Sequence, residues 1–131
     1  MANIKFNYLY RDGGNWKKYA AVVFSNPTEL SLAEIDGKIR MSMKPDALFI
    51  AHQLRLREAF LFSGEGYVSV EDHCFHEYDS IEQSPQLADD ESDRTIDEFL
   101  RELENIVKTV GWQLFDPCDR FMSLERISRL T

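Results

Sequence analysis

Residues 4–25 read IKFNYLYRDGGNWKKYAAVVFS, and this stretch predicts a β-hairpin. From Ile4 to Tyr10 every second residue is aromatic or aliphatic, which is the period of a strand with one buried face. The second half, residues 16–25, places Ala20, Val22 and Phe24 on one face in the same way. Between the halves, Asp12-Gly13-Gly14-Asn15 contains glycines that can supply the positive φ angles of a tight turn.

Two capping boxes mark the starts of helices. Ser31 with Glu34 precedes a short apolar stripe and predicts a helix that ends before Pro45. Thr95 with Glu98 precedes a long amphipathic stripe that runs to a C-terminal cap at Gly111. The apolar positions of this second helix are Ile96, Phe99, Leu100, Leu103, Ile106, Val107 and Val110.

The remaining segments give weaker patterns. We expect strands at 47–51, 67–70 and 74–81, an exposed loop at 84–92, a short strand at 112–115 and a last short helix at 120–130. Residues 53–62 fit a broken strand and a short helix nearly equally. Because the predicted strands come early in the chain and the long helix comes late, we predict a single α+β domain over residues 1–131. Its antiparallel sheet should have about four to six strands, with one long and one or two short helices packed on one face.

The composition is that of an ordinary globular chain, since 44% of the 131 residues are hydrophobic and 29% are charged. No apolar run approaches the roughly 18 residues that a membrane-spanning helix needs, and the first residues lack a signal-peptide layout. We therefore expect no membrane partner and a cytoplasmic location. Cys74 and Cys118 form no C-x-x-C motif and are expected to be free thiols.

The formal net charge of −8 is concentrated in one segment. Residues 71–104 hold thirteen acids against only Arg94 and Arg101, a local net charge of −11. A segment of this charge repels phosphates, so we expect no direct nucleic-acid binding through it. Its helical half has an adequate explanation as the solvent side of an amphipathic helix, whereas residues 71–93 carry nine acids and no Lys or Arg.

Dense acidity through a strand and a loop predicts a docking surface for a basic protein, because complementary charge speeds encounter and selects partners. Asp89, Asp90, Glu91 and Asp93 form its most compact patch, and Tyr78 is the aromatic anchor we expect. The alternative is a face that only keeps the chain soluble. The candidate partner-binding residues are Glu71, Asp72, Glu77, Tyr78, Asp79, Glu82, Asp89, Asp90, Glu91 and Asp93.

The segment from Asp72 to Glu77 is the only cluster of metal-ligand side chains. On a strand Asp72, Cys74 and His76 share one face, and His73 and Glu77 share the other. A closed zinc site needs a fourth ligand, for which only His52 and Cys118 remain, and the spacing matches no usual zinc pattern. The simpler interpretation of this segment is a half-exposed strand with two ordinary histidines. A small metal-binding protein or metal-dependent enzyme built around Asp72, Cys74 and His76 is kept as an alternative function, and a structural subunit of a homo-oligomer is another. We expect no metal and no other cofactor.

Catalytic signatures are absent from the sequence. It contains no G-x-S-x-G or H-E-x-x-H motif, and the Gly13-Gly14 pair is followed by a predicted strand, not by the helix that a phosphate loop requires. Enzymatic activity is therefore not the expected function.

The stretch from Phe6 to Lys17, together with Val23-Phe24-Ser25-Asn26-Pro27, resembles a group of small uncharacterised bacterial proteins that share this YLYRDGGNWK-type hairpin. The resemblance covers about the first forty residues. It implies a bacterial or phage origin and no biochemical role. In size and acidity the chain is also similar to immunity proteins that neutralise basic toxins and to small phage inhibitors of bacterial defence.

Overall fold

A computed structural model describes residues 2–43, 46–61 and 73–117. The strands are β1 (Asn3–Arg11), β2 (Lys17–Phe24), β3 (Leu48–Phe49) and β4 (His76–Ser84), and they form one sheet in the order β2-β1-β4-β3. The helices are α1 (Leu32–Ser42), the short 3₁₀ helix η1 (Ala51–Leu54) and α2 (Ile96–Thr109). The predicted strand at 67–70 and the predicted helix at 120–130 lie outside the described residues.

The predicted hairpin is confirmed, with Ile4 opposite Phe24 at one end and Arg11 opposite Lys17 at the other. The turn differs from the expectation, because the residue with positive φ is Asn15, at 68°, and neither Gly13 nor Gly14. The Asn15 N–H donates to the Asp12 carbonyl at 3.1 Å, and the Trp16 N–H donates to Asp12 Oδ1 at 2.9 Å. An Asx-type hydrogen bond thus closes the turn, and an asparagine tolerates the left-handed conformation.

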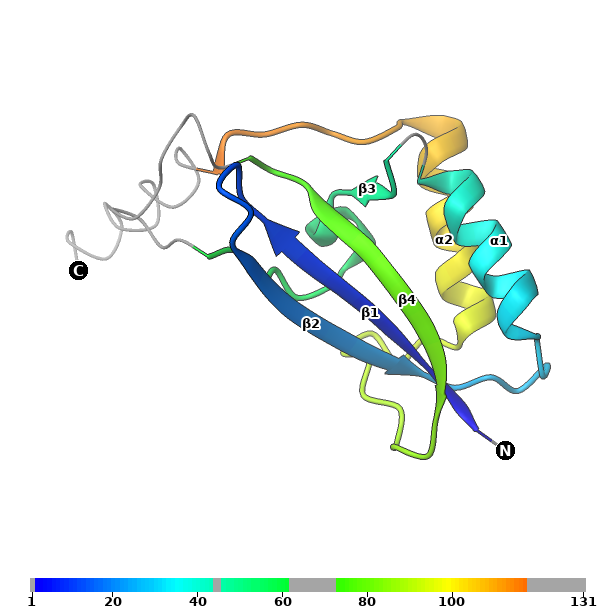
Figure 1. The fold of residues 1–131 in the computed structure, drawn as a ribbon. Coiled ribbons are helices and arrows are strands. Elements are labelled where there is room, and N and C mark those ends of the chain that lie inside the picture. The colour runs from blue at the N-terminus through cyan, green and yellow to red at the C-terminus, as the bar shows by residue number, and fades with distance from the viewer. Residues whose placement is uncertain (1, 44–45, 62–72, 118–131) are drawn as a thin grey trace, which may run out of the picture.

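The second edge of β1 pairs with β4, so the strand nearest the N-terminus lies at the centre of the sheet (Figure 1). Lys5 lies opposite Glu82, and the register shifts by one residue at a bulge beside Asn7 and Tyr8. All pairings between the named strands are antiparallel, which confirms the predicted sheet type. β3 is only two residues long and pairs with His76 and Glu77.

Both α-helices pack on one face of the curled sheet, and the α+β class is confirmed (Figure 1). Ser31 caps α1, and Thr95 and Glu98 form a reciprocal capping box at the start of α2. One prediction is wrong, since residues 112–115 form no strand. Of the two alternatives for residues 53–62, the described part shows only the last two residues of η1; the chain then turns at Arg55, whose φ is 56°, and residues 56–60 form neither helix nor strand. Among the residues described, no helix has the length and apolar character to cross a membrane.

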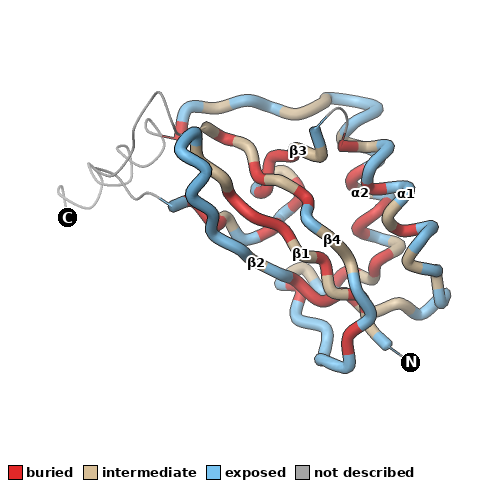
Figure 2. The backbone as a smooth tube through the Cα atoms, in the orientation of Figure 1, coloured by how far each residue is buried: buried red, intermediate tan, exposed pale blue. Residues whose placement is uncertain are grey.

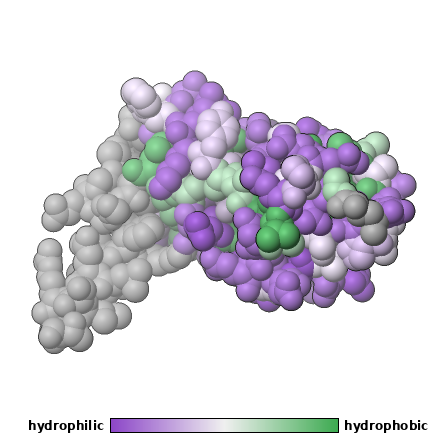
Figure 3. All heavy atoms as spheres, turned by 90° about the horizontal axis from the view of Figure 1, so that it is seen from below, coloured by the Kyte–Doolittle hydropathy of each residue, from purple (hydrophilic) through white to green (hydrophobic). Residues whose placement is uncertain are grey.

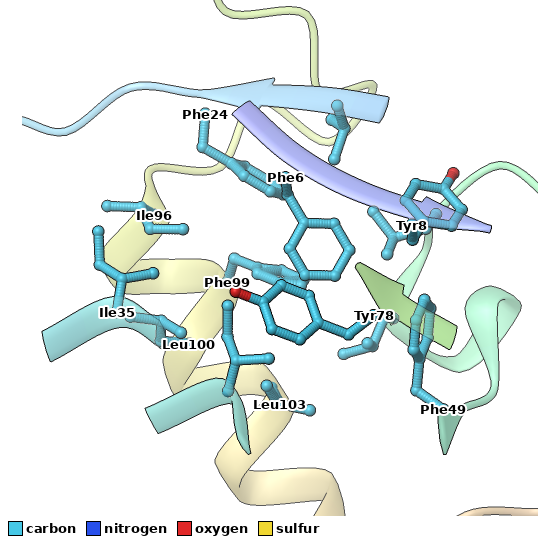
Figure 4. Close-up of a cluster of buried hydrophobic side chains, with 14 of the residues drawn as sticks. Phe6, Tyr8, Phe24, Ile35, Phe49, Tyr78, Ile96, Phe99, Leu100 and Leu103 are labelled. Carbon is cyan, nitrogen blue, oxygen red and sulfur yellow. The ribbon is translucent and has the colours of Figure 1, made fainter. Parts of the chain in front are cut away.

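The hydrophobic core lies between the sheet and the two helices, and Figure 4 shows its central side chains pointing toward one another. The Phe6 ring contacts four aromatic rings, those of Tyr8, Phe49, Tyr78 and Phe99, with centroids 5.2–6.0 Å apart. Burial alternates along the first half of β1, as Figure 2 shows in red and tan, and this is the pattern that the sequence predicted.

Candidate interaction surface

The residues that follow β4 form a loop fixed against the end of the sheet. We call residues 85–93 the acidic loop; in Figure 1 it is the yellow-green segment at the lower end of the sheet. The Asp89 N–H donates to the Val23 carbonyl at 3.0 Å, and the Val23 N–H donates to Asp89 Oδ1 at 2.8 Å. This pair of hydrogen bonds covers part of the outer edge of β2, and it fixes the middle of the loop.

A buried ion pair holds the far end of the acidic loop. Arg94 donates from Nε to Asp90 Oδ2 at 2.9 Å and from a terminal nitrogen to Oδ1 at 3.0 Å, and its backbone N–H adds a third bond to the same carboxylate. Only 2% of the Asp90 side chain and 4% of the Arg94 side chain are exposed. Such a fork-to-fork pair has the strongest hydrogen-bond geometry available to these groups.

Arg94 also links three other parts of the fold. It donates to the Leu54 carbonyl at 2.7 Å and to Glu102 at 2.9 Å, and its guanidinium lies over the rings of Phe24 and Phe99. Burial by itself would raise the pKa of Asp90, but the hydrogen bonds from Arg94 outweigh burial and hold that pKa below its ordinary value. The carboxylate is therefore ionised at neutral pH, and the ion pair is part of the core.

Two of the predicted partner-binding residues face the interior. Asp90, expected in an exposed patch, is the buried partner of Arg94. Tyr78, expected to anchor a partner, is almost fully buried, and its hydroxyl donates to Asp36 Oδ1 at 2.6 Å. The fold explains both: a turn from Asp90 to Asp93 brings Asp90 to Arg94, and Tyr78 lies on the face of β4 that the helices cover.

The other predicted residues have different surroundings. Glu77 forms an ion pair with Arg11 at 3.0 Å, and Glu71 and Asp72 lie outside the described residues. Five acids are exposed: Asp79 and Glu82 on β4, and Asp89, Glu91 and Asp93 in the acidic loop. Asp89 already uses one carboxylate oxygen on Val23, and Glu91 has a solvent-exposed pair with Arg57 at 3.3 Å.

Sequence reasoning missed one residue of this surface. Leu87, in the middle of the acidic loop, is 88% exposed. A leucine in a polar loop gives no periodic pattern, so only its isolation among Pro, Gln and acids could have drawn attention to it. Figure 3 views the molecule from the side on which the loop lies and shows hydrophobic groups isolated in a largely hydrophilic surface.

Charge is separated along the sheet. Lys5 of β1 lies opposite Val23 of β2 on one side and opposite Glu82 of β4 on the other. Because Asp89 is hydrogen-bonded to Val23, Asp89 and Glu82 lie at the same level along the strands. Arg11 and Lys17 lie opposite each other at the hairpin end, and Lys18 follows. Lys5 lies between Glu82 and Asp89, and Glu77 pairs with Arg11, so the end that holds Glu82 is only net acidic and the hairpin end only net basic. This difference favours one orientation of a charged partner.

The histidines of the candidate metal cluster bind the backbone. The Phe75 N–H donates to His73 Nδ1 at 3.0 Å, His73 Nε2 lies 2.7 Å from the Arg11 carbonyl, and the Ala59 N–H donates to His76 Nε2 at 2.8 Å. Within residues 2–43, 46–61 and 73–117, no three His, Cys, Asp or Glu side chains come together as metal ligands. Cys74 is a buried free thiol, and Asp72 and Cys118 lie outside these ranges.

His76 gives the chain a pH-dependent stability. Burial, and then the neighbouring His73, lower the pKa of His76 from 6.5 to about 4. Between these pH values, His76 consequently binds a proton in the unfolded chain but not in the folded chain. The contribution of His76 to the free energy of unfolding is therefore fully present above pH 6.5 and is lost as the pH falls toward 4. We expect the His76 contribution to unfolding free energy to drop by about 2–3 kcal/mol between pH 7 and pH 4.5.

Urea unfolding at the two pH values measures this contribution. His76→Gln, which keeps an acceptor for Ala59, should lose about 2–3 kcal/mol less on acidification than the parent chain. His52→Gln, at an exposed histidine, is the control, and it should alter the pH dependence less than His76→Gln does. The same pH dependence in the parent and in His76→Gln would contradict the assignment.

Comparisons of the chain with protein-family models, with curated proteins and with solved structures found no match. The exposed residues of the acidic loop and their fixed positions are the basis for the functional inference.

Proposed function

We propose that this chain is a protein–protein interaction module that docks a basic partner through the acidic loop. One observation supports this best: a loop fixed by hydrogen bonds carries both the exposed Leu87 and the exposed acids Asp89, Glu91 and Asp93. An exposed hydrophobic residue in an acidic loop combines an anchor for a partner's pocket with electrostatic selection of that partner.

The fixed backbone of the loop favours binding. Gln86 donates its N–H to Ser84 Oγ at 3.1 Å, Asp89 is bound to Val23, and Asp90 is bound to Arg94. A loop that already has one conformation loses little conformational entropy when a partner binds, so more of the contact energy appears as affinity.

The charges suit a basic partner. The exposed ion pair between Glu91 and Arg57 contributes little to stability, so a partner's Lys or Arg can replace Arg57 at small cost. Size and acidity fit an immunity or inhibitor protein, in which such a loop would cover a basic active surface. The whole-chain charge of −8 would add long-range attraction.

Affinity capture with matched variants tests this proposal. The immobilised chain is incubated with lysate of the cells that carry its gene, at low and at high salt, and bound proteins are quantified by mass spectrometry. The loop variant is Leu87→Ser with Asp93→Lys. The matched control is Leu114→Ser with Glu29→Lys, since Leu114 is also exposed and since Glu29 and Asp93 are both exposed acids with φ near 50–55°.

We expect a basic protein that the parent and the control retain at low salt, that high salt releases, and that the loop variant binds at least about tenfold less. Equal capture by the loop variant and the control would show that the acidic loop is not the docking surface. Capture of no salt-sensitive protein by the parent chain would contradict the proposal as a whole.

A further inference from the structure

Within the described residues, one edge of strand β4 is largely unpaired. Its inner edge pairs with β1 from Glu77 to Ser84, whereas β3 covers only His76 and Glu77 on the outer edge. One more backbone bond, from the Tyr78 N–H to the Ala47 carbonyl at 2.9 Å, ends this coverage. From Asp79 to Gln83, no described strand lies on the outer edge of β4.

The hydrogen-bonding pattern of the β2-β1-β4 pairings determines which backbone groups of β4 point away from β1. Val23 uses its N–H and its carbonyl on Asp89, so it does not bond to Lys5, which lies opposite it. Residues in an antiparallel ladder alternate their bonding direction, so Lys5 bonds toward its β4 neighbour Glu82. The N–H and carbonyl groups of Ile81 and Gln83 therefore point away from β1, toward the open edge.

The side chains along the outer edge of β4 favour a basic strand as the partner. Glu82 is exposed on the face of the sheet away from the helices, and Asp79 is exposed at the bulge. Ile81 lies opposite Phe6, on the helix side, and packs partly against the core. Two copies of this edge would bring like charges together, which disfavours self-pairing, whereas a strand rich in Lys or Arg would meet opposite charge.

We propose that the outer edge of β4, from Asp79 to Gln83, accepts an extended basic segment of the partner as an added strand. The added strand would alternate basic residues, beside Glu82, with apolar residues, beside Ile81. This rests on the proposed function, because it specifies how the same basic partner binds: through backbone hydrogen bonds in addition to the acidic loop.

A defined peptide tests the added strand. The probe is a fluorescein-labelled octapeptide of alternating Lys and Val, and binding is followed by fluorescence anisotropy at low salt. The control probe is the same peptide with N-methyl groups on alternate residues, which keeps the charge and removes the backbone donors of one edge. We expect saturable binding of the first peptide and binding at least about tenfold weaker for the second.

Amide hydrogen exchange locates the peptide. The Ile81 and Gln83 amides, for which the described residues supply no strand partner, should exchange at least about tenfold more slowly when the unmethylated peptide is bound. Glu82→Lys should weaken peptide binding about tenfold, while the matched charge change Glu29→Lys leaves it within about twofold. Gln83→Pro, which removes an outward N–H, should abolish binding, and circular dichroism checks that this variant is folded.

The failures of the two proposals can be told apart. Equal binding of the methylated and unmethylated peptides, or unchanged exchange at Ile81 and Gln83, would overturn strand addition while leaving capture by the acidic loop intact. Leu87→Ser should reduce capture of the natural partner and leave peptide binding within about twofold of the parent. If no peptide binds, the edge proposal is wrong whatever the lysate experiment shows.

Discussion

Replacing Arg94 with Met is expected to lower the free energy of unfolding by about 3–5 kcal/mol. Methionine fills much of the same space but leaves the Asp90 carboxylate, 2% exposed, without its counter-ion. The Leu54 carbonyl loses its donor as well. A domain of this size is stable by only about 5–15 kcal/mol, so this one change removes a large fraction of the total.

Chemical unfolding of two further variants separates the ion pair from general packing damage. Arg57→Ala removes the exposed partner of Glu91 and should change stability by no more than about 0.5 kcal/mol. Asp90→Leu combined with Arg94→Met removes both charges, so it should recover part of the loss seen in Arg94→Met. An effect of Arg94→Met no greater than that of Arg57→Ala would contradict the buried ion pair.

Phe6→Ala is expected to lower the free energy of unfolding by about 3–5 kcal/mol, the range for a phenylalanine deleted from a packed core. The ring is fully buried, and it contacts rings from β1, β3, β4 and α2. Its loss would leave a cavity that several elements line, and strands paired on both sides cannot move inward to fill it.

Urea unfolding with a matched aromatic on the opposite face of the sheet provides the control. Tyr19 lies on the neighbouring strand and is 63% exposed, so Tyr19→Ala should change stability by within about 0.5 kcal/mol. Phe6→Leu should show a smaller loss than Phe6→Ala because less volume is removed. A loss below about 1 kcal/mol for Phe6→Ala would show that Phe6 is not central to the core.

Local signals predicted the longer elements of this fold. The hairpin and both α-helices follow from periodicity and from caps at Ser31 and Thr95, because those signals lie within a few residues of one another. The segment 46–60 could not be predicted in this way. Its two-residue strand and single 3₁₀ turn are determined by contacts with β4 and α2, which are distant in the sequence.

The candidate site shows the same limit. Sequence placed Asp90 among exposed acids because four carboxylates within five residues resemble a solvated run. Its pairing with Arg94 depends on how the acidic loop meets the sheet and on Leu54, forty residues away. Likewise, strand alternation places Cys74, His76 and Tyr78 on one face, but only the fold shows that this face is buried.

The central position of β1 has a consequence for synthesis on the ribosome. β1 and β2 emerge before β4, so the second edge of β1 lacks its β4 partner until β4 is made, some sixty residues after β2 ends. At about 5–20 residues per second, the nascent hairpin would wait roughly 3–12 s with the second edge of β1 unpaired. Chaperones that bind aromatic segments would have that interval to act, and translation pauses within residues 25–84 would lengthen it.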